Sequence, residues 1–144
     1  LKAYDDLSTF KLYALDVGLL RQLSELDASV LLLSTPGYME YKGALAENYV
    51  LQSLTAQFQA SFRYWTSGNK AEVDFLLQYD NHIYPIEVKA DQNVTGKSLI
   101  QYEKLFQPVY RIRYSMLNLK QDGNLINIPL FLADKTKELL KDKS

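Results

Sequence analysis

Two segments of alternating character, residues 71–78 and 83–90, constrain this chain more than any other part of its sequence. Asp80 and Asn81 lie between them, and these residue types tolerate the left-handed backbone that a two-residue hairpin turn needs. The segments are therefore predicted to pair as an antiparallel hairpin, with Tyr79 opposite His82 next to the turn.

This register sorts the side chains of the hairpin onto two faces. Asp74 would lie directly opposite Glu87 on one face, and Lys89 would lie opposite Glu72. Two ionised carboxylates at that separation repel by about 4 kcal/mol at the dielectric typical of a protein surface. A proton, Lys89 or a divalent cation has to compensate, and we expect a metal site. The other face would be apolar or aromatic throughout, formed by Val73, Phe75, Leu77, Tyr84, Ile86 and Val88.

Length and composition indicate one ordinary globular domain of 144 residues, with a formal net charge of −1. There is no cysteine, no apolar run long enough to cross a bilayer and no visible signal peptide, so we expect a cytoplasmic protein without membrane contact. Most nucleic-acid-binding domains have a basic excess. Contact with nucleic acid would therefore need a local patch, for which the candidates are Lys70, Lys97, Arg111 and Arg113.

An α/β core is predicted over residues 43–133, with a mixed central sheet flanked by helices. Its expected elements are a helix over 43–58, strands over 62–66, 71–78 and 83–90, a helix over 98–107 capped by Ser98, a strand over 109–116 and an edge strand at 126–128.

Two segments flank this predicted core. Residues 1–42 form a lead-in, in which 10–15 could be a short strand, Asp16 could cap a helix, and Thr35-Pro36-Gly37 marks a loop. Residues 134–144 form a charged C-terminal tail with a fraying helix.

Glu47 falls within the apolar stripe of the first core helix, between Ala44 and Leu51. A carboxylate on a buried helix face is costly unless it is paired or bound to a cation. Glu47 either reaches solvent at the edge of the stripe or joins the acidic residues of the hairpin.

The order helix, three strands, helix and strand, together with these residues, resembles the restriction-endonuclease-like superfamily of PD-(D/E)XK nucleases. The resemblance implies that Glu47 is the helix carboxylate, that Asp74 is the strand aspartate, and that Glu87 and Lys89 form the E-x-K pair. Val73 stands where the superfamily name has proline. By the resemblance, Asp74, Glu87 and Glu47 would bind Mg²⁺ or Mn²⁺, and Lys89 would orient water or stabilise phosphate charge.

A narrower resemblance rests on the segments 10–20, 41–48, 72–75 and 86–89. These resemble a domain of unknown function at the C-terminus of a group of prokaryotic AAA+ ATPases. The resemblance implies that residues 1–42 connect to a missing N-terminal ATPase part of the same polypeptide. Gly96-Lys97-Ser98 imitates the end of a phosphate-binding loop, but Asp91 stands where that loop needs glycine, so we expect no nucleotide binding by this chain.

The leading hypothesis is therefore a metal-dependent DNA nuclease domain. The alternatives are a non-catalytic interaction or regulatory module that retains this fold and couples the ATPase to a partner, and a purely structural ion-pair cluster. The sequence leaves the oligomeric state and the form of the nucleic acid open.

Overall fold

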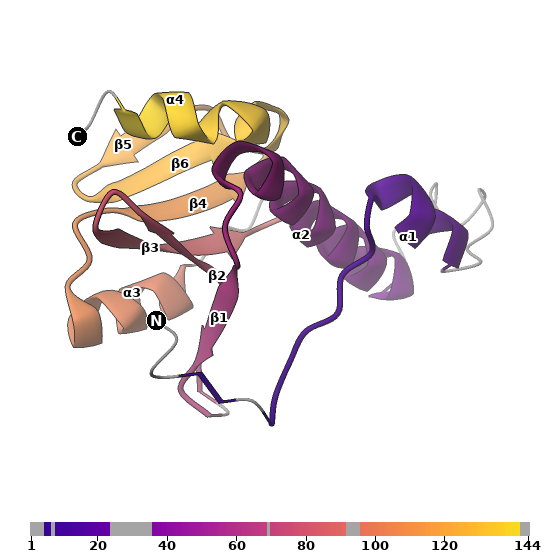
Figure 1. Cartoon of the computed structure of the whole chain (residues 1–144), viewed down its shortest axis with the longest axis horizontal. Helices are drawn as coiled ribbons and strands as arrows, with labels where there is room; N and C mark the ends of the chain where they lie inside the picture. Colours follow the sequence, from indigo (N-terminus) through magenta and orange to yellow (C-terminus); the bar gives the residue numbers. More distant parts are fainter. Residues whose placement is uncertain (1–4, 7, 24–35, 69, 92–95, 142–144) are drawn as a thin grey trace.

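A computed structural model describes residues 5–6, 8–23, 36–68, 70–91 and 96–141 of the chain (Figure 1). In chain order, its elements are α1 (Val17–Leu23), α2 (Pro36–Phe58), β1 (Arg63–Thr66), β2 (Glu72–Tyr79), β3 (His82–Val88), α3 (Lys97–Phe106), β4 (Arg111–Ser115), β5 (Lys120–Asp122), β6 (Leu125–Pro129), the 3₁₀ helix η3 (Leu130–Lys135) and α4 (Thr136–Lys141).

The strands of the described residues form one six-stranded sheet in the order β1-β2-β3-β4-β6-β5. Strands β1, β2 and β3 pair antiparallel, β4 runs parallel to β3 and β6, and β5 is an antiparallel edge strand. Helices α2 and α4 pack on one face of this sheet and α3 packs on the other (Figure 1). The predicted α/β class is confirmed, and α2-β1-β2-β3-α3-β4 follows the predicted order of elements.

The hairpin of β2 and β3 has the predicted register near its turn, but the predicted pairs Asp74–Glu87 and Val73–Val88 are not part of its ladder. Regular pairing runs from Tyr79 and His82 to Phe75 and Ile86. Asp80 and Asn81 have φ angles of 48° and 61°, which is the left-handed conformation expected for this turn.

One extra residue in β2 interrupts the alternation beyond this ladder. Strand β1 advances by two residues from Arg63 to Trp65, while β2 advances by three from Leu76 to Val73, which is a β-bulge. Val73 therefore packs with Leu76 on the face covered by α3, and Phe75 packs on the opposite face. The prediction that Val73 shares a face with Phe75 was wrong, because a bulge shifts the two-residue period by one position.

Helix α2 begins at Pro36 and not at the predicted Gly43. Proline suits the first turn of a helix, where its missing N–H removes no hydrogen bond. Pro36-Gly37 therefore marks the start of a helix and not a loop, whereas Thr35 lies outside the described residues. The predicted boundary between lead-in and core, at residues 42 and 43, falls inside this helix.

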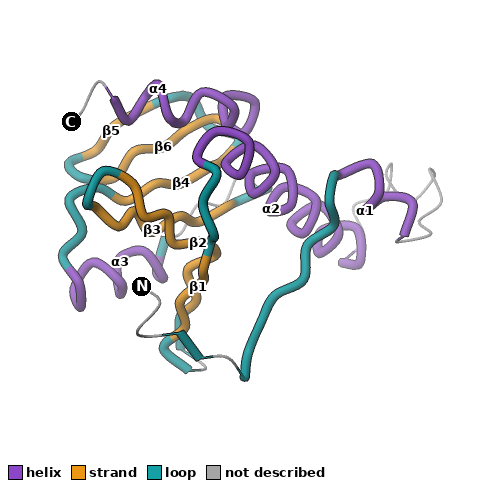
Figure 2. The backbone as a smooth tube through the Cα atoms, viewed as in Figure 1, coloured by secondary structure: helices purple, strands orange, loops and turns teal. Residues whose placement is uncertain are grey.

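Residues 10–15 run as a loop towards α1 and do not form the predicted strand (Figure 2). The backbone of this segment bonds to a side chain of α2 instead of a neighbouring strand: the N–H of Ala14 donates to Oδ1 of Asn48 at 2.9 Å. Asp16 caps α1 as predicted, because its Oδ1 accepts the N–H of Leu19 at 2.8 Å.

Two further elements differ from their predictions. Helix α3 is preceded by Gly96 as its capping residue, so Ser98 lies within the helix and does not cap it. The segment 126–128 belongs to β6, which lies between β4 and β5 and is not an edge strand. Strand β5 was missed because Lys120–Asp122 is polar and exposed at every position and has no alternation to detect.

The charged segment from residue 134 is folded onto the core up to Lys141. Leu140 of α4 is 1% exposed and packs with Val50 and Leu54 of α2. The predicted fraying was wrong for this part of the segment, because α4 contributes to the main core, and residues 142–144 lie outside the described part.

Gln57 joins the end of α2 to the C-terminal helices. Its Nε2 donates to the carbonyl of Ala133 at 2.7 Å, and its Oε1 accepts the N–H of Lys137 at 3.0 Å. Replacing Gln57 by alanine should lower the free energy of unfolding by about 1–3 kcal/mol, because part-buried backbone groups lose their partner. Urea unfolding would measure this, with Thr55→Ala on the exposed side of α2 as control. An unchanged unfolding midpoint for Gln57→Ala would contradict the assignment.

None of the helices in the described ranges is long and apolar enough to cross a membrane.

Candidate functional site

Asp74 lies in the bulged part of β2, just beyond the last regular pair of the hairpin. Its Oδ2 accepts a hydrogen bond from the backbone N–H of Val88 at 2.7 Å. The carboxylate is thus fixed where the backbones of β2 and β3 no longer pair regularly.

The surroundings of Asp74 favour its protonated form. Burial is the largest cause, and the negative charge of Glu47 adds to it, so that the pKa of Asp74 rises from its ordinary 3.8 to about 7. The hydrogen bond from Val88 and the charge of Lys11 act in the opposite direction, and the charge of Glu87 raises the pKa slightly further. Asp74 is therefore only partly ionised at neutral pH and lies within electrostatic reach of both other predicted acids.

Glu87 and Lys89 lie at the carboxyl end of β3, beside the parallel strand β4. Glu87 is 2% exposed, and its Oε1 lies 3.0 Å from Nζ of Lys89. Its Oε2 is buried and has no hydrogen-bond partner among the described residues. A Cβ atom on Gly96 would lie 3.4 Å from this oxygen, so a glycine before α3 leaves space next to it. A buried carboxylate oxygen without a partner is costly, and such an atom is a candidate ligand for a cation.

Glu47 is half-buried on α2 and faces the segment that precedes α1. Its Oε2 accepts a hydrogen bond from Oη of Tyr13 at 3.3 Å. The negative charge of Glu47 raises the pKa of Asp74, so these two carboxylates lie within electrostatic reach of each other.

Lys11 is a residue of this site that the sequence reasoning missed. Its ammonium pairs with the carboxylate of Glu72. The predicted pairing of Glu72 with Lys89 is not found in the structure, because the regular ladder ends at Phe75 and Lys89 pairs with Glu87 instead. No signal in residues 10–13 alone identifies Lys11, because its partner Glu72 lies far along the chain and the segment is a loop.

The charge of Lys11 interacts with the carboxylates of Glu72, Glu47 and Asp74. Burial lowers the pKa of Lys11, but the carboxylate of Glu72 and the charges of Glu47 and Asp74 outweigh it and raise the pKa overall. Burial, and after it the negative charges of Glu47, Asp74 and Glu72, raises the pKa of Tyr13.

The candidate site thus has two neighbouring parts. One contains Asp74 and Glu47 with Lys11, and the other contains Glu87 with Lys89. No group of three or more histidine, aspartate or glutamate side chains in the described part is arranged to hold a metal ion. The donor chemistry is of the kind that Mg²⁺ uses, since Mg²⁺ in proteins is commonly held by one or two carboxylates and completes its shell with water and phosphate oxygens. Asp74 and Glu87 are the two carboxylates, and Oε2 of Glu87 has no competing partner among the described residues.

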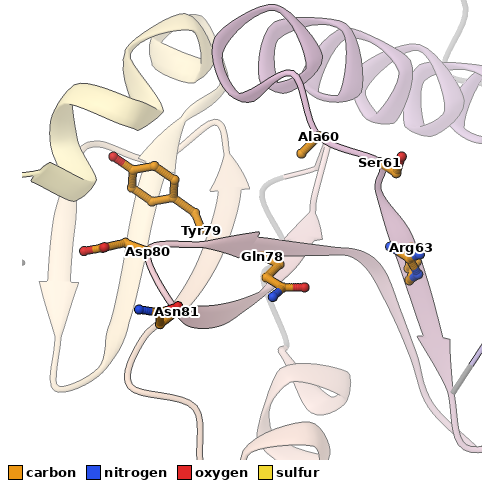
Figure 3. Close-up of a pocket in the computed structure, with 7 residues that line it drawn as sticks. All are labelled: Ala60, Ser61, Arg63, Gln78, Tyr79, Asp80 and Asn81. Carbon is orange, nitrogen blue, oxygen red and sulfur yellow. The ribbon is translucent and has the colours of Figure 1, made fainter. Parts of the chain in front are cut away.

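Of two hollows on the described surface, one contains residues of the candidate site and the other does not. The larger, of about 600 Å³, lies at the turn end of the hairpin (Figure 3), and Gln78, its lining residue nearest to Asp74 along β2, is four positions away from it. It is lined by Ala60, Ser61, Arg63, Gln78, Tyr79, Asp80 and Asn81, none of them a predicted site residue. The smaller hollow, of about 260 Å³, lies between the loop before α1 and helix α2, and Lys11, Tyr13, Glu47 and Asn48 contribute to its lining.

Of the basic residues considered for nucleic-acid contact, Arg111 and Arg113 are engaged in internal contacts, whereas Lys70 is exposed. Arg111 lies 3.0 Å from the carboxylate of Glu103, and Arg113 donates from Nε to Oδ1 of Asn127 at 3.0 Å. Lys97 is exposed at the start of α3. The arginines therefore contribute to structural contacts within the sheet and α3.

A family model described as a domain of unknown function (DUF4143) matches residues 42–131, which is more than half of the chain. The chain belongs to the DUF4143 family. No curated protein and no solved structure matches it.

The DUF4143 match runs from early in α2 into η3 and contains all four predicted site residues. The resemblance to a domain of unknown function is thereby confirmed at the level of this family. Lys11 and Tyr13 precede the matched region.

Proposed function

We propose that this DUF4143 domain is a metal-dependent nuclease domain that hydrolyses phosphodiester bonds of DNA. The observation that carries the proposal is the buried Glu87, with one oxygen paired to Lys89 and the other without a partner among the described residues. The order of elements from α2 to β4 agrees with a restriction-endonuclease-like core, which is the fold that we propose.

Asp74 and Glu87 would hold Mg²⁺ or Mn²⁺, and Glu47 would extend the acidic site beyond them. The bound cation would act as a Lewis acid towards the phosphodiester group. Lys89 is about one-third exposed at its side chain, so it can donate a hydrogen bond to a phosphate oxygen while it neutralises Glu87. Burial of Glu87 lowers the local dielectric and would strengthen the interaction of its carboxylate with a cation.

We also propose that the domain works as the C-terminal part of an AAA+ ATPase, with the ATPase part on the N-terminal side of the same polypeptide. This rests on the resemblance of the segments around residues 10–20 and 41–48 to such proteins. The ATPase would deliver the DNA or control access to the acidic site.

A second candidate is an interaction or regulatory module without catalytic activity. It is favoured by the net charge of −1 and by the engagement of Arg111 and Arg113 in internal contacts. Such a module would use the sheet and helices as a rigid surface for a partner of the ATPase.

Cleavage of plasmid, single-stranded and branched DNA in Mg²⁺ or Mn²⁺ separates the two candidates. The nuclease predicts cleavage that requires the cation, and it predicts that Asp74→Asn weakens Mn²⁺ binding by about tenfold or more, because one carboxylate charge is lost. Titration calorimetry would measure the affinity. Asp80→Asn in the exposed hairpin turn removes the same charge far from Glu87 and should change neither binding nor cleavage.

Cleavage and Mn²⁺ affinity that Asp74→Asn leaves unchanged would sink the assignment of this residue. A chain that neither binds Mn²⁺ nor cleaves any of the three DNA forms, alone or joined to its ATPase, would favour the interaction module.

A further inference from the structure

The loop of residues 10–16, here called the strap, runs towards α1 (Figures 1 and 2) and contacts Glu72 and Glu47. Three contacts hold it there. The ammonium of Lys11 pairs with Glu72, Tyr13 Oη donates to Glu47 at 3.3 Å, and the N–H of Ala14 donates to Asn48 at 2.9 Å. The strap therefore touches β2 and α2 mainly through polar groups.

Lys11 supplies the positive charge in the contact between the strap and the acidic residues. Its ammonium lies 5.1 Å from the centre of the Tyr64 ring and bonds with Glu72, whose side chain is half exposed. Glu47 and Asp74 attract the same ammonium. The ammonium of Lys11 thus places a positive charge beside Glu72, within electrostatic reach of Glu47 and Asp74.

The packing of the strap is asymmetric. The rings of Tyr13 and Phe75 lie 5.6 Å apart and anchor its inner side. Its outer side exposes large apolar residues, with Phe10 74% and Leu12 87% exposed. Segments with few buried apolar contacts open at low free-energy cost.

The contact between strap and α2 is also incomplete. The hollow of about 260 Å³ separates them, and Nδ2 of Asn48 is buried there without a hydrogen-bond partner among the described residues, although Asn48 is only 2% exposed. An unpaired buried donor destabilises the closed arrangement and favours its opening.

We propose that the strap is an autoinhibitory element and that Lys11 is its internal cation, which a divalent cation has to displace from the acidic group. The inference rests on the proposed nuclease function and adds a regulatory step to it. A ligand shifts such an equilibrium only through different affinity for the closed and open states. Here the difference comes from repulsion between the ammonium and the incoming ion in the closed state.

Mn²⁺ affinity of the purified 144-residue chain tests the inference, with binding followed by electron paramagnetic resonance. Lys11→Met removes the charge but keeps the apolar stem of the side chain, and it should bind Mn²⁺ about tenfold or more tightly than wild type. Lys11→Arg keeps the charge and should bind like wild type. If Lys11→Met does not melt cooperatively, Lys11→Gln serves as a second variant without the positive charge.

Hydrogen exchange provides an independent measure of strap opening. In wild type, Mg²⁺ should speed amide exchange at Ala14, whose N–H is covered by Asn48 in the closed strap. Exchange at Val88, whose N–H is bonded to Asp74 in the sheet, should not speed up and serves as the internal control.

Each outcome bears on one of the two proposals. Equal or weaker Mn²⁺ affinity in Lys11→Met than in wild type would overturn the strap inference and leave the nuclease proposal standing. Binding by the neutral variants alone would support the inference and show that wild type is fully closed. No binding by wild type or by any variant would overturn the metal site, and the inference with it.

Discussion

Replacing Lys89 by methionine is expected to lower metal-dependent DNA cleavage by about 100- to 1,000-fold, which is the usual cost of removing one donor to a developing negative charge. Lys89 is the ammonium next to Glu87, with Nζ 3.0 Å from Oε1, and its side chain remains about one-third exposed. It can therefore contact Glu87 and a phosphate oxygen together. Methionine keeps the apolar length of lysine and removes only the charge and its donors.

The same substitution leaves Glu87 buried without its counter-ion. Breaking a buried pair in this way can cost about 3–5 kcal/mol of stability, so melting of each variant has to accompany the rates. A divalent cation that binds Glu87 would take over this neutralisation. Mn²⁺ should therefore stabilise Lys89→Met more than it stabilises wild type.

A matched control is available in β5. Lys120 lies 3.0 Å from Asp122, the same separation as in the Lys89 pair, but on the exposed far edge of the sheet. Lys120→Met should leave cleavage unchanged. Cleavage at the wild-type rate by Lys89→Met, with its melting profile intact, would exclude Lys89 from the reaction.

The hairpin could be predicted from the sequence because its signals are local. Asp80 and Asn81 supply the turn, and alternation on both sides sets the register that the structure has from Tyr79 to Phe75. The same local rules could not reveal the bulge near Val73. A bulge depends on how β1 pairs with β2, and nothing in residues 71–78 alone marks the extra residue.

In the candidate site, too, residues with a local sequence signal could be predicted, and residues that depend on contacts between distant segments could not. Glu47 was detectable as a carboxylate within an apolar stripe, and its approach to Asp74 followed from packing α2 on the sheet. The role of Lys11 was not detectable in that way. Its partner Glu72 lies far along the chain, and the segment around Lys11 was expected to be a strand and not a loop.

Asp74→Asn is expected to stabilise the protein at alkaline pH and to flatten the dependence of its stability on pH. In the folded chain the pKa of Asp74 is about 7, against an ordinary value of 3.8. Between these values the folded state holds a proton that the unfolded state has lost, so the free energy of unfolding falls as pH rises through this window. Burial and the charge of Glu47 cause this loss, and the uncharged amide of the variant would not have it.

The size of the effect has an upper limit. A pKa difference corresponds to about 1.4 kcal/mol for each pKa unit, so Asp74→Asn can raise the free energy of unfolding by at most about 4 kcal/mol. This full gain is expected only at pH values above the folded-state pKa of Asp74. Asparagine keeps an oxygen that can accept the N–H of Val88, so the variant removes the charge without removing the hydrogen bond. Urea unfolding at pH 5 and at pH 8, without divalent cations, would measure the change.

A purely structural ion-pair cluster predicts the opposite sign at pH 8, because such a cluster would lose a favourable charge in Asp74→Asn. Asp80→Asn, in the exposed turn, should follow the wild-type pH dependence and shows whether any change is specific to the acidic site. Adding Mg²⁺ at pH 8 should raise the stability of wild type more than that of Asp74→Asn, since only wild type has the full negative charge to offset. Lower stability of Asp74→Asn at pH 8, with no response to Mg²⁺ in either protein, would identify the carboxylates and lysines as a structural cluster and not as a cation site.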